Sequence, residues 1–248
     1  MSDDDKQLVL GVLGGMGPAA TVDFMQKLVA LTPAACDQEH LPVVIASLPH
    51  IHDRSRSILG LGDDPWPQLR RGIELLNRAE VGLLAIPCNS AHHWFERISE
   101  HSKAPVLHIG RASVQAIAYG SAAKVAIFAT RGVNLSGFYR RECEARGFAV
   151  WVPGSDGDQN YVDACIKLVK AGRLKEAGAA LMCALASARA AGADTVILGC
   201  TELPIASEYM AEKSSLALVD CSLELARAAV AYGLERGWNK PDWTTAPA

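Results

Sequence analysis

Two cysteines, Cys88 and Cys200, occupy matching positions in this sequence. Each follows a short apolar run, at residues 84–87 and 196–199, and each precedes a polar residue. A thiol has an ordinary pKa of about 8.5, so modest tuning makes it an acid or a base near neutral pH. Two thiols on opposite sides of a planar intermediate could remove a proton from one face and return a proton to the other. Stereoinversion at an amino acid Cα needs this arrangement.

The elements that must position these thiols follow from the alternation of apolar runs with longer amphipathic stretches. This alternation predicts an α/β fold with mostly parallel sheets flanked by helices. Strands are expected at residues 8–13, 43–47, 82–87, 106–109, 124–129, 149–152, 195–199 and 216–220. Helices are expected at residues 21–31, 67–79, 92–101, 135–146, 158–170, 174–191 and 223–236. Both cysteines then lie at carboxyl ends of strands, where open α/β sheets bind ligands.

The chain also resembles a duplication. Cys88 lies 76 residues after Val12 in the first strand, and Cys200 lies 73 residues after Ile127 in the corresponding later strand. We therefore expect two pseudo-symmetric lobes with the site in the cleft between them. Residues 1–110 form an N-terminal lobe with Cys88, and residues 111–222 form a C-terminal lobe with Cys200. The helix at 223–236 is expected to pack back on the first lobe, and residues 237–248 to form a loose tail.

Composition excludes several classes of function. The 248 residues have a formal net charge of -3 and no cluster of Lys and Arg, which argues against nucleic-acid or membrane-surface partners. Apolar runs are strand-sized, far below the roughly 20 residues that span a bilayer. Seven cysteines at irregular spacing, without a CxxC pair, indicate neither a disulfide framework nor a zinc site. We expect free thiols in a reducing cytoplasm.

A glycine-rich turn follows the first expected strand, with the sequence Gly14-Gly15-Met16-Gly17-Pro18. It fits neither GxGxxG nor a phosphate loop ending in GKS or GKT, so a nucleotide-binding module is disfavoured. The same geometry at the start of a helix can present backbone N–H groups to a carboxylate.

Four motifs together resemble those of the aspartate racemases, in the aspartate/glutamate racemase superfamily. In chain order they are Gly14-Gly15-Met16-Gly17-Pro18, Asp37-Gln38-Glu39-His40, Pro87-Cys88-Asn89-Ser90-Ala91-His92 and Gly199-Cys200-Thr201-Glu202-Leu203. The resemblance extends from about residue 8 to residue 227. It implies a two-lobed enzyme that needs no pyridoxal phosphate or metal and is commonly a homodimer. The implied reaction interconverts the enantiomers of a small acidic amino acid, aspartate or glutamate, with Cys88 and Cys200 as the two bases.

The resemblance also suggests substrate contacts. Arg54 and Lys170 stand where aspartate racemases have cations in the site, and arginine can bind a carboxylate through two parallel hydrogen bonds. The alternative for each is a solvated surface cation. The residues expected to bind the α-amino or carboxylate group are Asn89, Ser90, Thr130 and Thr201. Met16 and Gly17 are expected to supply backbone or wall contacts.

Two places in the sequence separate this chain from the related glutamate racemases. Those enzymes typically have an Asp-Ser pair in the first turn and a histidine two residues after the second cysteine, where this chain has Gly14-Gly15 and Glu202. The aspartate-type or a broader subgroup therefore fits better. Glu202 could hold the Cys200 thiol or the substrate ammonium, or it could cap the next turn. His92 is expected to be structural, because the two cysteines already serve both faces.

Other functions remain open on the same fold. Hydantoin racemases and maleate isomerases retain both cysteines, whereas arylmalonate decarboxylases retain one. A rival of another class is a non-catalytic binding protein for acidic amino acids. Such a binder would keep its affinity after Cys88→Ser and would exchange no α-proton.

Overall fold

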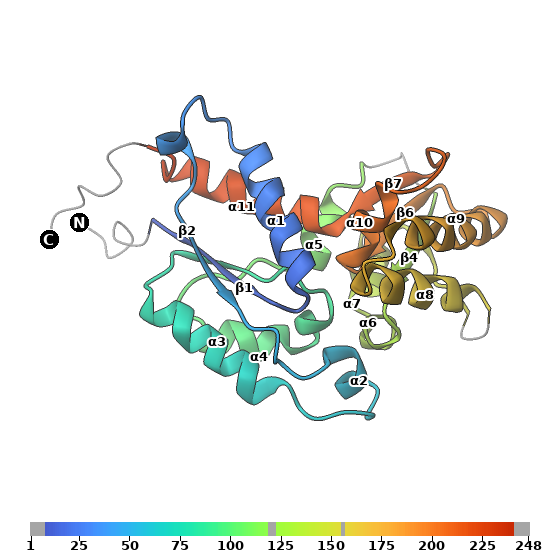
Figure 1. Cartoon of the computed structure of the whole chain (residues 1–248), viewed down its shortest axis with the longest axis horizontal. Coiled ribbons are helices and arrows are strands. Elements are labelled where there is room, and N and C mark those ends of the chain that lie inside the picture. Colours follow the sequence, from blue (N-terminus) through green and yellow to red (C-terminus); the bar gives the residue numbers. More distant parts are fainter. Residues whose placement is uncertain (1–7, 119–122, 155–156, 241–248) are drawn as a thin grey trace, which may run out of the picture.

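The chain folds into two lobes, each built on a parallel sheet with helices around it (Figure 1). The computed structural model describes residues 8–118, 123–154 and 157–240. Within them the first sheet has the order β2-β1-β3, and the second has the order β5-β4-β6-β7. Every strand pair is parallel. The predicted α/β class is confirmed.

The strands form where apolar residues run without interruption. Those of the first sheet are β1 (Leu10–Gly14), β2 (Val43–Ser47) and β3 (Leu83–Ala85). Those of the second are β4 (Lys124–Ala129), β5 (Ala149–Trp151), β6 (Thr195–Gly199) and β7 (Ala217–Asp220). Every residue of β1, β3 and β6 is buried, because helices cover both faces of a parallel sheet.

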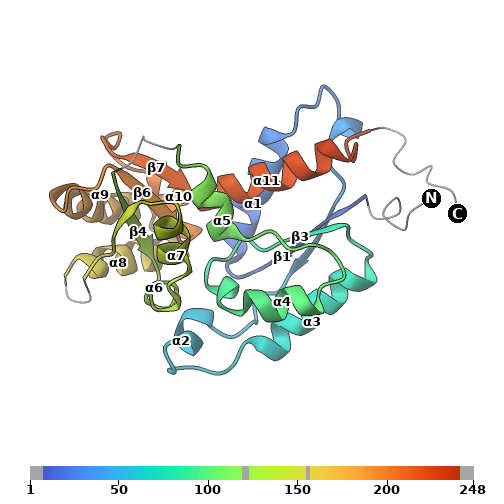
Figure 2. The same cartoon turned by 180° about the vertical axis from the view of Figure 1, so that it is seen from behind.

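The helices follow their strands in sequence and cover the sheets (Figure 2). The first lobe contains α1 (Pro18–Leu31), η2 (Asp37–Glu39), α2 (Arg54–Ile58), α3 (Trp66–Arg78), η3 (Ser90–Trp94), α4 (Phe95–His101) and α5 (Ile109–Gln115). The second contains α6 (Arg131–Ser136), α7 (Phe138–Ala145), α8 (Asp158–Lys170), α9 (Leu174–Ala190), α10 (Glu202–Ser207) and the start of α11 (Cys221–Glu235).

Three expected elements differ in the structure, and one of them is the helix expected at residues 92–101, which consists of η3 followed by α4. The strand expected at residues 106–109 is a single bridge between Leu84 and Val106, and Ile109 already begins α5. The helix expected at residues 135–146 is two helices, α6 and α7, which meet at Gly137. Gly137 has φ of 70°, a left-handed conformation that ends one helix and that glycine adopts without strain.

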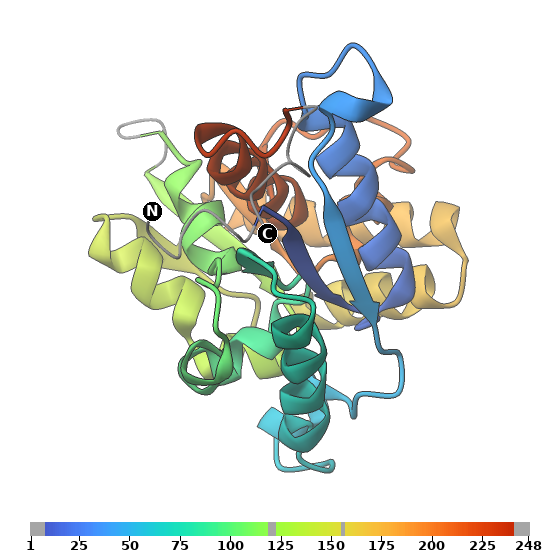
Figure 3. The ribbon, with the colours of Figure 1, turned by 90° about the vertical axis from the view of Figure 1, so that its left-hand side faces the viewer.

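The C-terminal helix α11 leaves the second sheet and returns to the first lobe. It lies beside α1 (Figure 3) and also contacts α5. Leu225 and Ala229 of α11 share one buried cluster with Leu10 and Phe24. Trp238 was expected in the loose tail, but it is 2% exposed and belongs to this cluster. Its indole ring packs on Tyr232. Residues 241–248 of the expected tail lie outside the described residues.

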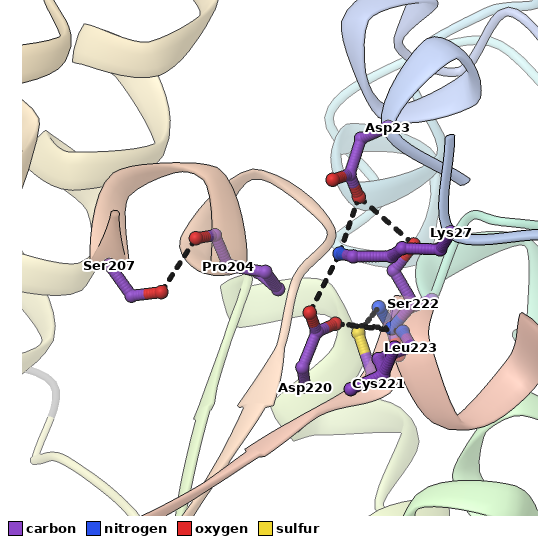
Figure 4. Close-up of polar contacts among 9 residues, drawn as sticks. Asp23, Lys27, Pro204, Ser207, Asp220, Cys221, Ser222 and Leu223 are labelled. Carbon is purple, nitrogen blue, oxygen red and sulfur yellow. Dashed lines mark hydrogen bonds and ion pairs between the residues drawn. The ribbon is translucent and has the colours of Figure 1, made fainter. Parts of the chain in front are cut away.

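A partly buried ion cluster connects α1 to the end of the second sheet (Figure 4). The Lys27 ammonium lies 2.7 Å from a carboxylate oxygen of Asp23 and 2.7 Å from one of Asp220. Burial lowers the pKa of Lys27, but the two carboxylates outweigh burial and raise it. Asp220 also accepts hydrogen bonds from the N–H groups of Ser222 and Leu223, which caps α11. One carboxylate therefore orients the helix that links the lobes.

Candidate active site

Cys88 and Cys200 line the same cavity, between the carboxyl ends of β3 and β6. Its volume is about 310 Å³, and both cysteines are buried in its wall. We call it the central cavity. Its described lining also includes Met16, Asp53, Arg54, Ser55, Arg56, Leu59, Asn89, Ser90, Thr130, Arg131, Asp163, Ile166, Lys167, Lys170, Thr201 and Glu202. Of the eleven residues that the sequence proposed as catalytic or substrate-binding, ten line it and Gly17 does not.

The residues after Cys88 connect the two lobes. The hydroxyl groups of Ser90 and Thr130 lie 3.2 Å apart, one from each lobe. Thr130 also caps α6, since its hydroxyl accepts from the N–H of Val133. The Asn89 side chain is buried and bonded to Tyr139 and Cys221, so it has a fixed orientation in the wall.

The second cysteine has a carboxylate partner. The Cys200 thiol donates to Glu202 Oε2 at 3.0 Å, and both side chains are buried. Burial, followed by the negative charge of Glu202, raises the pKa of Cys200 well above its ordinary value. Glu202 Oε1 lies 3.7 Å from the ammonium of Lys170, whose side chain is half exposed. Burial lowers the pKa of Lys170, but Glu202 and the other acidic groups around it together outweigh burial and raise the pKa, so Lys170 is a cation.

Glu202 lines the central cavity, and no side-chain cap hydrogen bond forms at the start of α10. A thiol, a carboxylate and an ammonium are arranged in series there. In such a series a proton can move between the sulfur and the carboxylate oxygen, which shifts the negative charge between them while a cation is nearby.

The glycine turn passes close to the β2 end of the first sheet. Gly15 has φ of 86°, and a Cβ there would lie 2.3 Å from the backbone nitrogen of Leu48, so a side chain is excluded. This sharp turn directs Met16 into the central cavity. Gly17, the residue before α1, lines an adjoining cavity of about 560 Å³ that shares Met16, Arg54 and Glu202 with the central one.

Arg54 lines the central cavity, but both terminal nitrogens of its guanidinium already donate to backbone carbonyl groups. Nη1 donates to the carbonyl groups of Ile51 and His52, both at 2.9 Å, and Nη2 donates to that of Met16 at 3.0 Å. Nε is buried without a partner in the described part of the chain. Arg54 therefore fastens the loop before α2 to the glycine turn, and a carboxylate would have to compete with backbone carbonyls for it.

Two helices contribute side chains to the cavity wall that the sequence did not predict. One is α2, which supplies Ser55 and packs on α6 through a hydrogen bond from the N–H of Gly132 to Ser55 Oγ at 3.1 Å. The other is α8, where Asp163, Ile166 and Lys167 line the cavity with Lys170. These positions precede Lys170 by seven, four and three residues, one face of a helix. That spacing could have identified them.

His92 lies behind Cys88 rather than in the central cavity. The N–H of Ile109 donates to Nε2 at 3.2 Å, so Nδ1 has the proton and donates to the Cys88 carbonyl at 2.9 Å. Burial lowers the pKa of His92 to about 4. His92 is therefore a neutral tether between the backbone of Cys88 and α5, which agrees with the structural role expected for it.

The remaining features of the described residues are negative findings. Cys36, Cys143, Cys165, Cys183 and Cys221 do not line the central cavity, and all seven cysteines are free thiols. Within residues 8–118, 123–154 and 157–240, no group of three or more His, Cys, Asp or Glu could hold a metal ion. No helix in those same ranges is long and apolar enough to cross a membrane.

The chain is similar to known racemases in sequence and in fold. A family model described as Asp/Glu/Hydantoin racemase matches residues 13–229. The broad specificity amino-acid racemase RacX of Bacillus subtilis is 27% identical over 226 residues, which cover 90% of this chain and 96% of RacX. The structure of Picrophilus torridus aspartate racemase superposes with a TM-score of 0.80 at 27% identity, over 91% of this chain and 94% of that one. A glutamate racemase from Francisella tularensis, solved with D-glutamate, shares the fold with a TM-score of 0.68 at 17% identity, over 94% of this chain and 83% of that one.

Proposed function

The chain belongs to the Asp/Glu/Hydantoin racemase family and is an amino acid racemase of the aspartate racemase-like subgroup; from this premise we propose that it interconverts L- and D-aspartate or glutamate by a two-base cysteine mechanism. The observation that supports the mechanism is the presence of Cys88 and Cys200 in one buried cavity, one from each lobe.

In the proposed reaction one thiolate removes the Cα proton of the bound amino acid. The opposing thiol protonates the carbanion on the other face, and the two sulfurs exchange roles in the reverse direction. Loss of the Cα proton places negative charge on the substrate carboxylate, which hydrogen-bond donors and cations stabilise. Asn89, Ser90, Thr130 and Thr201 are the proposed donors, and Glu202 is the proposed partner of the substrate ammonium.

The preference for an acidic substrate is supported by the charge of the central cavity. Its described lining has five basic residues and three acidic ones. An amino acid with two carboxylates and one ammonium has a net charge of −1 and complements this excess. The basic residues are Arg54, Arg56, Arg131, Lys167 and Lys170, and the acidic residues are Asp53, Asp163 and Glu202. Arg131 is paired closely with Asp163 at 2.7 Å, whereas Lys170 has only a longer contact of 3.7 Å with Glu202, so Lys167 and Lys170 are the better candidates for the distal carboxylate.

The test is proton exchange at Cα, followed by proton NMR in D2O. Purified protein without added cofactor is mixed with single enantiomers of aspartate, glutamate and a panel of neutral and basic amino acids. We expect deuterium incorporation together with loss of optical activity on the acidic amino acids. Inversion of many unrelated amino acids instead would assign the broad specificity that the name of RacX describes.

The cysteine roles predict opposite defects in two variants. Cys88→Ala and Cys200→Ala should each reduce racemisation by at least a thousandfold while the fold is retained. If each sulfur serves one face, each variant should still exchange the Cα proton of one enantiomer, and the two variants should differ in which one. Cys183→Ala, which changes an exposed thiol outside the cavity, is the matched control. A single-cysteine variant with near-full racemisation would rule out two bases.

The rivals separate in the same assay. A hydantoin racemase or a maleate isomerase would leave free amino acids unexchanged and convert its own substrate. A binding protein for acidic amino acids would exchange nothing and would tolerate Cys88→Ser. We also propose that the reaction needs neither pyridoxal phosphate nor a metal, so dialysis against a chelator and treatment with hydroxylamine should leave the rate unchanged.

We further propose that the protein is a cytoplasmic homodimer. The surface of α1 and the edge strand β2 exposes Val22, Val29 and Ile45, which a second copy of the chain could cover. Light scattering after size exclusion should give twice the chain mass. Substituting Lys at Val22 and Ile45 should give the monomer, and a dimer that persists in this variant would place the interface elsewhere.

A further inference from the structure

Asn89 follows Cys88 directly, and its side-chain amide is held from behind by residues far away in the sequence. The Tyr139 hydroxyl lies 2.6 Å from Asn89 Oδ1, and Asn89 Nδ2 lies 3.1 Å from Cys221 Sγ. Tyr139 is on α7 in the second lobe, and Cys221 begins α11. All three side chains are buried.

The direction of these bonds is determined by what each group can donate. An amide oxygen only accepts, so the Tyr139 hydroxyl donates to Oδ1, and 2.6 Å is typical of an O–H to oxygen bond rather than an N–H one. The Ser113 hydroxyl donates its own proton to the Ile109 carbonyl at 2.7 Å. It lies 3.4 Å from the Tyr139 hydroxyl, farther than Asn89 Oδ1 at 2.6 Å. The sulfur of Cys221 is then the acceptor for one of the two N–H bonds of Asn89.

The two contacts remove the rotational freedom of the amide. An unrestrained Asn can turn its terminal group by half a turn and exchange oxygen for nitrogen. Here the oxygen is bonded to Tyr139 and one N–H is directed to Cys221, so one amide N–H remains for the central cavity, which Asn89 lines. Burial raises the pKa of the Tyr139 hydroxyl well above its ordinary value, so the phenol remains a donor across the assay range.

We propose that Tyr139 is a positioning residue of the racemase, which fixes the Asn89 amide so that it presents N–H rather than C=O beside Cys88. The inference rests on the proposed contact between Asn89 and substrate. It also makes the alignment of the lobes part of the site, because the second lobe orients a residue of the first.

The experiment is Tyr139→Phe, which removes only the hydroxyl group. Losing the bond frees the amide and leaves a buried acceptor unpaired, an effect of about tenfold or more. Because Asn89 would contact bound substrate before and during proton transfer, we expect KM to rise about tenfold while kcat changes less than threefold. Cys221→Ala, which removes the acceptor of the amide N–H, should raise KM in the same way and serves if Tyr139→Phe does not fold.

A double-mutant cycle separates positioning from general loosening of the core. Asn89→Ala should itself raise KM, and Tyr139→Phe should change KM less than twofold further in that background. The matched control is Cys143→Ala, one helical turn from Tyr139 in the same buried cluster and without a hydrogen bond to Asn89 among the described residues. It should lower the melting temperature but leave KM unchanged.

The outcomes distinguish this inference from the proposed function. If the wild-type protein inverts no acidic amino acid, the proposed substrate class is wrong, and the cycle is repeated on the substrate that it does invert. If the wild-type protein is active but the two substitutions multiply, or Cys143→Ala raises KM equally, Tyr139 does not act through Asn89. An Asn89→Ala variant with wild-type kinetics would overturn the inference as well.

Discussion

The two cysteines differ in the groups beside their sulfur atoms. Cys200 donates to Glu202 Oε2 at 3.0 Å, whereas Cys88 makes no side-chain hydrogen bond within the described ranges. A buried thiolate next to a carboxylate is costly, because two like charges would share a site of low dielectric. The raised pKa therefore favours the thiol form of Cys200. Binding of a substrate ammonium at Glu202 would offset the carboxylate charge and favour the thiolate when the base is needed.

This interaction predicts the effect of Glu202→Gln on Cys200. The substitution keeps an acceptor of the same size but removes the negative charge that raises the pKa of Cys200. The pKa should fall, so the rate of alkylation of Cys200 by iodoacetamide should increase at lower pH than in the unsubstituted protein. The rate is measured by mass spectrometry of the Cys200 peptide in a Cys88→Ser background. Glu208→Gln, a charge loss beyond the end of α10, should leave the profile unchanged.

At the scale of the element, local patterns predicted the strands of both sheets and the long helices but missed short helices. The expected strands at residues 43–47, 124–129 and 195–199 coincide with β2, β4 and β6. The short helices α2, α5 and α10 were not predicted. Each has at most seven residues, too few for a helical period to repeat. The break at Gly137 was missed because a glycine inside an amphipathic pattern signals a helix end only through its φ angle.

That break predicts the effect of Gly137→Ala on stability. A Cβ at φ of 70° is strained by about 1 kcal/mol or more. The free energy of unfolding should fall by about that amount in urea, with an unchanged slope. Gly154→Ala is the matched control, because that glycine is exposed, its φ is not in the left-handed region and nothing lies within 4 Å of an added Cβ. Equal losses in both variants would contradict the strain argument.

At the scale of the whole molecule, α5 and α11 join the two lobes, and two histidines hold the start of α5. His92 Nε2 accepts from the N–H of Ile109, and His108 Nδ1 accepts from those of Gly110 and Arg111. Both roles need a neutral ring. Burial lowers the pKa of His92 to about 4 and that of His108 to about 3.

The two histidines predict loss of stability in acid. A pKa that is lower in the folded than in the unfolded chain means that unfolding takes up protons between the two values. Stability is therefore full above the unfolded pKa of about 6.5 and falls below it, by at most about 1.4 kcal/mol per pH unit for each of the two rings. Unfolding in urea between pH 7 and pH 5 measures the slope. His108→Asn keeps a capping side chain but does not titrate, so it should reduce the slope by about half; an unchanged slope would exclude His108 as a cause.

The sequence by itself determined the α/β class, most of the strands and the two cysteines at strand ends, because these depend on runs of neighbouring residues and on a repeat of similar spacing. It also placed ten of the eleven named site residues around one cavity. Only the tertiary structure decided the engagement of Arg54 with backbone carbonyls, the lining contributed by α2 and α8, and the orientation of Asn89. Asn89 meets Tyr139 and Cys221 across 50 and 132 residues of chain, and contacts at such separations depend on how whole elements pack rather than on any local pattern.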